Sequence, residues 1–443
     1  MTAEELGPGL EMSVFEMCDS LGDKLASPTA DYALLADDAL AMRIKSAKNA
    51  FDDMDRNLMR DAVGRANPWE QASTKAHHIF QNRAAMKMAE VDWLFNLTGR
   101  AYSNPDTEPE PTHHDHLLYF ADVCAGPGGF SEYIYWRRQE AAKGWGFTLR
   151  GDHDFRMDKF NGTSPHWSFR PCYGVDDTGD VYQNENIRHF AHTVDKETGG
   201  LGISLMVADG GDSVDGEFLK QEWLMRRLAL CQSIVALQIL RKGGNFFCKI
   251  FDTFTPFLHD LLYLLSRAFD RICVFKPLTS RPANSERYII CMGLKERKPA
   301  LGDYLMHVNI SMDDDEESIQ RRSGKQVRRI AKDVPDSWTQ YLRDANLRIG
   351  DAQAQALEDT MKFYEDPNLD ISILQTKVRK ALIAQWGVPE TVKESRALIE
   401  RWELPPHIAS HHAQEPQMFR YHEAKDRPVP PKALPRPAGV PAR

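Results

Sequence analysis

The sequence predicts an α/β fold built on a doubly wound, mostly parallel sheet, with helical extensions at both ends. Between about residues 117 and 294, apolar strand-like runs alternate with helical segments, the usual pattern of such a sheet. The last two runs, 271–277 and 286–294, are joined by a loop without a helix and predict an antiparallel pair at the end of the sheet. Helical periodicity on either side, as in 82–95 and 374–387, predicts the extensions.

The elements of the sheet region alternate in chain order. Strand-like runs cover 117–126, 145–150, 203–211 and 245–251, and helical runs cover 129–142 and 222–240. The first strand runs into a turn of glycine and proline, and the long second helix is stopped by Arg-Lys-Gly-Gly. Helical periodicity returns beyond about Lys298, and the last forty or so residues are rich in proline and poor in apolar pattern.

These patterns predict five segments. We expect a flexible N-terminal arm at 1–30, a helical N-terminal extension at 31–110, the sheet domain at 111–297, a helical C-terminal extension at 298–404 and a disordered proline-rich tail at 405–443.

The composition excludes several classes of protein. Of the 443 residues, 42% are hydrophobic and 27% are charged, a mixture that can bury a substantial core. A net charge of −9 argues against a nonspecific nucleic-acid binder but leaves room for a locally basic cleft. No run approaches the roughly 18 apolar residues of a membrane span, and the acidic N-terminus lacks an apolar secretory segment. The sequence predicts a soluble, intracellular protein with no membrane partner.

Metal and disulfide chemistry have little support in the sequence. The seven cysteines are scattered and never form C-x-x-C, so neither a disulfide framework nor a zinc site built on such pairs is expected. The three histidines of the polar loop 103–116 could suggest a metal site, but no second group of ligands lies at a suitable spacing. These are His113, His114 and His116. We therefore expect no metal.

A glycine-rich turn follows the first strand, at residues 122–130. Open sheets bind ligands outside the carboxyl ends of their strands, where glycines let the backbone approach a ligand and the next helix presents N–H groups. Dinucleotide enzymes place G-x-G-x-x-G here, but this turn reads G-P-G-G, and the second strand ends in Thr148-Leu149-Arg150 without an acid for a ribose. A purely structural tight turn is the remaining alternative.

Several motifs occur in the order of one family. They are K-S-A-K-N-A-F-D (45–52), R-A-N-P-W-E (65–70), N-R-A-A-M-K-M-A (82–89), D-V-C-A-G-P-G-G-F-S-E (122–132), A-D-G-G (208–211), F-F-C-K-I-F-D-T-F-T-P-F (246–257) and F-K-P-L-T-S-R-P-A-N-S-E-R-Y (275–288). The chain resembles the FtsJ-type (RrmJ-like) 2′-O-methyltransferases, and most fully the eukaryotic cap-specific mRNA (nucleoside-2′-O-)-methyltransferase 1 family. The likeness spans about residues 40–295 and extends more weakly to near Glu390. The family's G-patch, guanylyltransferase-like and WW modules are not visible in this sequence.

The resemblance implies a Rossmann-like, S-adenosylmethionine-dependent methyltransferase fold. It implies methylation of the ribose 2′-oxygen on the first transcribed nucleotide of 7-methylguanosine-capped mRNA. The implied partners are the capped mRNA 5′ end and the transcription or capping machinery, and the implied location is the nucleus.

The resemblance also implies the site residues. The catalytic tetrad falls on Lys87, Asp209, Lys249 and Glu286. The cofactor contacts fall on Asn82, Cys124, Ala125, Gly126, Pro127, Gly128, Gly129, Phe130, Asp180 and Val181. The contacts to capped RNA fall on Lys48, Asn49, Ala50, Phe51, Asp52, Leu219, Lys220, Gln221 and Asn284.

A lysine-rich tetrad suits this chemistry because a ribose hydroxyl must lose its proton as it attacks a methyl sulfonium. A lysine can accept that proton only if its pKa falls towards neutrality, through burial or a second cation. We expect Lys249 to be the base, Lys87 to lower its pKa and position the hydroxyl, and Asp209 to orient it. Glu286 would hold the lysine amines in register, and Asp180 would hold the adenosine end of the cofactor.

Each residue also has a simpler interpretation. A lysine after an apolar strand is usually solvated, and Asp209 before two glycines is typical of a turn. Phe51 could be the core residue of an amphipathic helix. The basic cluster 321–329 could be a nuclear signal, an RNA-facing patch or a solvated helix face, and the prolines of 428–437 a polyproline ligand or a plain tail.

Three other functions compete with cap methylation. A tRNA or rRNA methyltransferase would share the tetrad, but minimal FtsJ-type enzymes lack the block at 45–70. A catalytically inactive RNA-binding scaffold would have no need of two buried lysines. An NAD-dependent oxidoreductase fits the glycine-rich turn least well.

Overall fold

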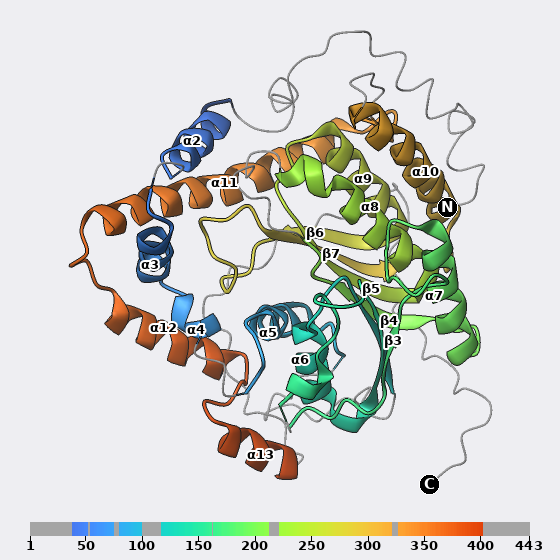
Figure 1. Cartoon of the computed structure of the whole chain (residues 1–443), viewed down its shortest axis with the longest axis horizontal. Helices are drawn as coiled ribbons and strands as arrows, with labels where there is room; N and C mark the ends of the chain where they lie inside the picture. The colour runs from blue at the N-terminus through green and yellow to red at the C-terminus, as the bar shows by residue number, and fades with distance from the viewer. Residues whose placement is uncertain are drawn as a thin grey trace.

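The computed structural model describes residues 38–51, 54–74, 79–99, 117–161, 163–211, 221–320 and 327–401. Within these ranges seven strands form one sheet in the order β3-β2-β1-β4-β5-β7-β6 (Figure 1). Neighbouring strands are parallel, except that β7 is antiparallel to both β5 and β6. The strands are β1 Leu118–Val123, β2 Ala142–Phe147, β3 Phe169–Cys172, β4 Ile203–Ala208, β5 Leu240–Ile250, β6 Phe269–Phe275 and β7 Arg287–Leu294.

Helices cover both faces of the sheet, as a doubly wound fold requires (Figure 1). One face packs against α5 Ala84–Phe95 and α6 Gly129–Arg138. The other packs against α7 Asn184–Glu197, α8 Gln221–Ile239, α9 Pro256–Ala268 and α10 Ala300–Gln320, and the short helices η4 Gln139–Ala141 and η5 Met157–Lys159 lie in connections. This arrangement confirms the predicted fold class.

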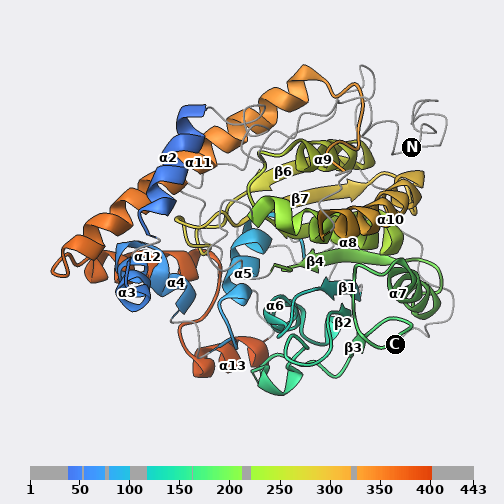
Figure 2. The same ribbon diagram turned by 45° about the horizontal axis from the view of Figure 1, so that its top comes forward.

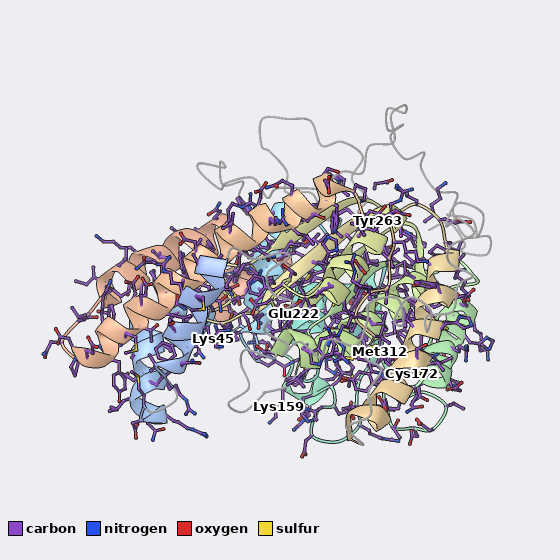
Figure 3. All side chains as sticks on the ribbon, turned by 90° about the horizontal axis from the view of Figure 1, so that it is seen from above. Lys45, Lys159, Cys172, Glu222, Tyr263 and Met312 are labelled. Carbon is purple, nitrogen blue, oxygen red and sulfur yellow. The ribbon has the colours of Figure 1, made fainter. Side chains whose placement is uncertain are left out.

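Helices from both predicted extensions pack together as one helical layer beside the sheet (Figure 2), whereas α10 of the C-terminal extension covers the sheet itself. In this layer α2 and α3 lie along α11, and α4 lies along α12. Lys45 marks the layer in Figure 3, whereas Cys172 lies in the sheet domain. The helices are α2 Asp38–Asn49, α3 Arg56–Ala66, α4 Glu70–Thr74, α11 Asp336–Glu365, α12 Ser372–Gln385 and, further along, α13 Val392–Arg401.

The contact between α2 and α11 combines close packing with a paired arginine. A Cβ at Gly350 of α11 would lie 2.9 Å from Leu40 Cδ2, so glycine lets the two helices approach. Arg43 of α2 makes a two-pronged ion pair with Glu358, at 2.6 Å from Nε and 2.9 Å from Nη2. Two segments about 300 residues apart in the chain thus form one unit.

The helix α5 belongs with the sheet rather than with this layer. The prediction assigned it to the N-terminal extension, yet it packs beside α6 and buries Met86, Val91 and Phe95 in the cluster under the sheet. The predicted boundary at 110 lies outside the described residues, as do the predicted arm 1–30 and tail 405–443.

The second strand was placed too late in the sequence. The structure has it at Ala142–Phe147, whereas the prediction was 145–150. Gly144 and Gly146 interrupt the apolar pattern by which a strand is recognised. Glycine occurs at both positions because aromatic rings of nearby residues occupy the space that a side chain would fill. A Cβ at Gly144 would lie 2.5 Å from the ring of Phe120, and one at Gly146 would lie 2.4 Å from the ring of Phe155.

Candidate active site

The alternation of strand residues places the predicted catalytic side chains on one face of the sheet. Val207 of β4 and Phe247 of β5 lie in the cluster beneath α5 and α6. Asp209 and Lys249 come two residues further along their strands and therefore leave the sheet on the same side. Lys87 approaches from α5, which covers that face.

The structure brings together the four residues of the predicted tetrad. The Nζ of Lys87 lies 2.9 Å from Glu286 Oε1 and 3.9 Å from Asp209 Oδ2. The Nζ of Lys249 lies 3.3 Å from Asp209 Oδ1. All four side chains are between 8% and 15% exposed, so the cluster is shielded while its edge can still be reached by solvent.

Tyr288 is a fifth member that sequence reasoning missed. Its hydroxyl accepts a hydrogen bond from Lys87 Nζ at 2.9 Å and donates one to Asp209 Oδ1 at 2.8 Å. Burial, followed by the charges of Asp209 and Glu286, raises the pKa of Tyr288 well above its ordinary value, so the hydroxyl remains a donor. A signal was present: the tyrosine lies two residues after Glu286 and therefore on the same face of the strand.

The sequence predicted a lowered pKa for Lys249, and this prediction is wrong: the pKa is raised. Burial alone would lower the pKa, but Asp209 and Glu286 outweigh burial and raise it above its ordinary value. Burial opposes the ionisation of Glu286, yet Lys87 and Lys249 together hold the pKa of this carboxyl far below its usual range. Both groups are therefore charged at neutral pH, and a base at Lys249 must first release its own proton.

The turn after β4 leaves room for Lys249. The amide of Gly210 donates to Gln232 Oε1 of α8 at 3.2 Å. A Cβ at Gly211 would lie 2.9 Å from Lys249 Cε and 2.8 Å from the ring of Phe251. A side chain at the second glycine of A-D-G-G would thus crowd the end of Lys249 and the ring of Phe251.

Gly211→Ala is expected to lower kcat about 10- to 100-fold, because the new methyl displaces the Lys249 amine from Asp209. The measurement is steady-state methyl transfer together with cofactor affinity, which should be unchanged. Gly64→Ala in α3 is the matched control, since its nearest contact would be 4.0 Å away. A Gly211→Ala enzyme with wild-type kcat would show that the lysine position tolerates this shift.

The glycine-rich turn lies at the carboxyl end of β1, as predicted, but its glycines serve the chain's own packing. A Cβ at Gly126 would lie 1.9 Å from the carbonyl oxygen of His153, and one at Gly129 would lie 2.1 Å from Asn82 Oδ1. Gly128 has a φ of +102°. These glycines therefore let the chain approach itself closely, and the expected approach of the backbone to a ligand stays a prediction.

The end of β1 fits a cationic ligand such as S-adenosylmethionine. Asp122 is fully buried, and its Oδ2 accepts from the Ser131 amide and hydroxyl, while Oδ1 has no hydrogen-bond partner among the described residues. Burial, with a smaller contribution from the charge of Asp209, raises the pKa of Asp122 to about 8. A positive group placed beside these two acids would relieve this unfavourable environment.

The other predicted cofactor residues differ in their surroundings. Asn82 lies against Gly129 and accepts the Ala84 amide at 2.9 Å. Asp180 accepts the Tyr182 amide at 2.8 Å in the segment after β3. Phe130 and Val181 are buried, each in the hydrophobic core on a different face of the sheet. The turn residues Cys124, Ala125 and Pro127 follow β1 directly.

The predicted RNA contacts that the structure describes lie where the helical layer meets the sheet domain. Phe51, just after α2, is half-buried and packs against the buried cluster that contains Leu40 and Phe254, which matches the simpler interpretation as a packing residue. Lys48 is half-buried, whereas Asn49 and Ala50 are exposed.

The loop before β7 reaches the start of α8 beside these residues. Gln221 accepts the Ser285 hydroxyl at 2.7 Å, and Asn284 is held by Lys276 at 2.8 Å. Asp52, Leu219 and Lys220 lie outside the described residues, as do the three histidines of 103–116, residues 321–326 of the basic cluster and the prolines of 428–437.

Across the part of the chain that the structure describes, no three histidine, cysteine, aspartate or glutamate side chains are arranged to hold a metal ion. Over the same residues, no helix has the length and apolar character needed to cross a bilayer.

Known proteins resemble this chain over most of its length. It is 41% identical over 374 residues to cap-specific mRNA (nucleoside-2′-O-)-methyltransferase 1 of Bos taurus, covering 80% of this chain and 42% of the relative. Proteins of the same name from Homo sapiens and Drosophila melanogaster are 41% and 39% identical, covering 79% and 81% of this chain and 42% and 45% of the relatives. The chain thus spans less than half the length of these curated relatives.

A solved structure described as a ribosomal RNA methyltransferase from Plasmodium falciparum covers 49% of this chain and all of its own, with 16% identity and a TM-score of 0.33. That likeness is too distant to support an argument. The family model described as FtsJ-like methyltransferase matches residues 80–294, which include the whole sheet and all four tetrad residues. Residues 80–294 of this chain thus match an FtsJ-like methyltransferase domain.

Proposed function

We propose that this chain transfers a methyl group from S-adenosylmethionine to the ribose 2′-oxygen of the first transcribed nucleotide of capped mRNA. The observation that carries the proposal is the buried cluster of two lysines, two acids and Tyr288 at the strand ends of an FtsJ-like domain. The names of the relatives support the substrate, and the family implies the methyl donor.

The contacts favour Lys249 over Lys87 as the base. S-adenosylmethionine, when bound, supplies a methyl group on a positively charged sulfur that an oxygen nucleophile can attack. Lys87 is fixed between Glu286 and the Tyr288 hydroxyl, both at 2.9 Å. Lys249 is paired only with Asp209 in the described part of the cluster. Lys249 is thus the amine better able to turn towards a ribose hydroxyl and accept its proton.

Asp209 organises both amines. Its Oδ1 accepts from Tyr288 and faces Lys249, and its Oδ2 faces Lys87. The carboxylate therefore orients the base and adds negative charge close to Asp122, where a cationic donor would be favoured. Glu286 balances the second ammonium, which keeps the cluster from carrying a costly excess of positive charge.

The position of α2 supports recognition of the cap. Phe51, just after this helix, and Ala283, next to Asn284, pack against the same buried cluster, so the end of α2 lies near the segment that carries Asn284 and Glu286. A cationic methylated guanine suits a carboxylate such as Asp52, and Lys48 suits the triphosphate bridge. We also propose, from the family resemblance, that the protein acts in the nucleus alongside transcription or capping machinery.

Lys48→Ala combined with Asp52→Ala is expected to raise KM for capped RNA about tenfold, with little change in cofactor affinity. The reason is the loss of the Lys48 ammonium, which suits the triphosphate bridge, and of the Asp52 carboxylate, which suits the cationic guanine. Kinetics with a short capped RNA measure KM, and calorimetry measures the cofactor. Lys377→Ala, an exposed lysine of α12, is the control. An unchanged KM in the double variant would show that Lys48 and Asp52 do not contribute to cap recognition.

The reaction itself is tested with capped RNAs that differ only at the first ribose. Transfer is expected to the 2′-hydroxyl form and not to an RNA that already carries a 2′-O-methyl group there. Equal incorporation into both RNAs would place the methyl group on another atom and overturn the proposal.

A further inference from the structure

A third lysine closes the loop that carries two site residues. Residues 276–286, which we call the β6–β7 loop, join the ends of two paired strands and carry Asn284 and Glu286. Lys276 follows β6 directly, and Glu286 directly precedes β7. The ammonium of the first residue thus lies at the mouth of the loop, beside the last residue.

Lys276 donates to three oxygens of this loop. Its Nζ lies 2.8 Å from the Asn284 carbonyl oxygen, 2.8 Å from Asn284 Oδ1 and 2.6 Å from the Glu286 carbonyl oxygen. An ammonium has three donors, so the three acceptors are matched. Burial lowers the pKa of Lys276 to about 7, although the charge of Glu286 acts in the opposite direction. The three acceptors favour the protonated form, because a neutral amine has only two donors and would leave one acceptor unpaired.

This contact determines which end of the Asn284 amide is presented. A protonated lysine can only donate, so the amide oxygen must face Lys276. The Nδ2 group therefore points away from Lys276 and offers N–H donors. Phosphate and ribose oxygens are acceptors, so this orientation suits RNA.

The same contact fixes the main chain of Glu286. The side chain of that residue reaches Lys87 at 2.9 Å while its carbonyl is held by Lys276. The other half of the loop is anchored by Glu90, which accepts the amides of Leu278 at 2.8 Å and Thr279 at 3.2 Å. Glu90 lies three residues after Lys87 on α5, so the loop is aligned with the helix that carries one catalytic amine.

We propose that Lys276 is a positioning residue for methyl transfer. It presents the Asn284 amide as a donor to the RNA and holds Glu286 where it pairs with Lys87. This inference rests on the proposed function, since it assigns the RNA as the partner of Asn284.

The test measures kcat and the KM for capped RNA, with cofactor affinity and melting temperature as further readouts. Lys276→Met keeps the length of the side chain and removes all three donors. It is expected to lower kcat about 10- to 100-fold through Glu286, and to raise the KM for RNA about 3- to 10-fold through Asn284. Cofactor affinity should be unchanged. Lys295→Met, which removes one exposed lysine–carbonyl contact beyond the far end of β7, should match the wild type.

A double-mutant cycle separates positioning from general loosening of the fold. Asn284→Ala alone should raise the KM for RNA and keep kcat, and in the Lys276→Met background it should add no further rise in KM. If the KM of the double variant rose by the product of the two single effects, Lys276 would not act through Asn284. If kcat were unchanged in Lys276→Met, Lys276 would not position Glu286. If Lys276→Met does not fold, Lys276→Gln is used instead. Glutamine keeps two donors, so a kcat between that of the wild type and that expected for Lys276→Met should result. A wild-type protein inactive on capped RNA would refute the proposed function instead.

Discussion

Lys249→Ala is expected to lower methyl transfer by at least about 10²-fold while S-adenosylmethionine still binds, because general base catalysis is typically worth roughly 10²–10⁴ in rate. The loss should appear in kcat, since Lys249 acts on the reacting hydroxyl. Lys242→Ala, at the exposed start of the same strand, is the matched control and should keep full activity. A folded Lys249→Ala enzyme that kept more than about a tenth of wild-type activity would remove the base from this position.

The same assignment predicts a pH dependence. Although burial opposes it, the net effect of Asp209 and Glu286 is to raise the pKa of Lys249, so the amine is protonated at neutral pH. A base must be deprotonated, so kcat/KM for RNA should rise as the pH goes from neutral to mildly alkaline. A profile that falls over this range would contradict a lysine base.

Lys87→Ala is expected to reduce kcat by a similar factor, and Lys87→Ala with Lys249→Ala should be little worse than either alone, because the amines act as a unit. The variant should also be less stable. Removing Lys87 leaves the Glu286 carboxylate, 14% exposed, without its partner at 2.9 Å.

A paired variant separates these two effects. Lys87→Met with Glu286→Gln removes both charges, so its melting temperature should return towards the wild-type value while its activity stays low. Recovery of activity along with stability would show that Lys87 acts only by stabilising the fold.

The parts of the fold that sequence could predict are those with regular patterns. Continuous apolar strands such as β4 and long helices such as α8 have ends within three residues of where periodicity put them. The strand β3 was missed because it has four residues and contains Pro171, which an edge strand tolerates. The strand β5 begins earlier, at Leu240, because the Arg-Lys-Gly-Gly read as a helix stop belongs to the strand.

The catalytic residues could be named from motifs, but their electrostatics depend on distances that a sequence does not contain. The proximity of Asp209 to both lysines decides the direction of the Lys249 pKa, and it required the packing of α5 against the sheet. Tyr288 and Lys276 could have been suspected from their motif, yet their hydrogen bonds follow from the folded β6–β7 loop.

The central claim is tested most directly by comparing two copies of one short RNA, with and without a 7-methylguanosine cap. The full chain is supplied with labelled S-adenosylmethionine, and the product is digested to map the methylated nucleotide. We expect label only in the capped RNA, on the 2′-oxygen of the first transcribed nucleotide. Equal turnover of both RNAs, or label at an internal nucleotide, would contradict cap recognition and favour a tRNA or rRNA methyltransferase.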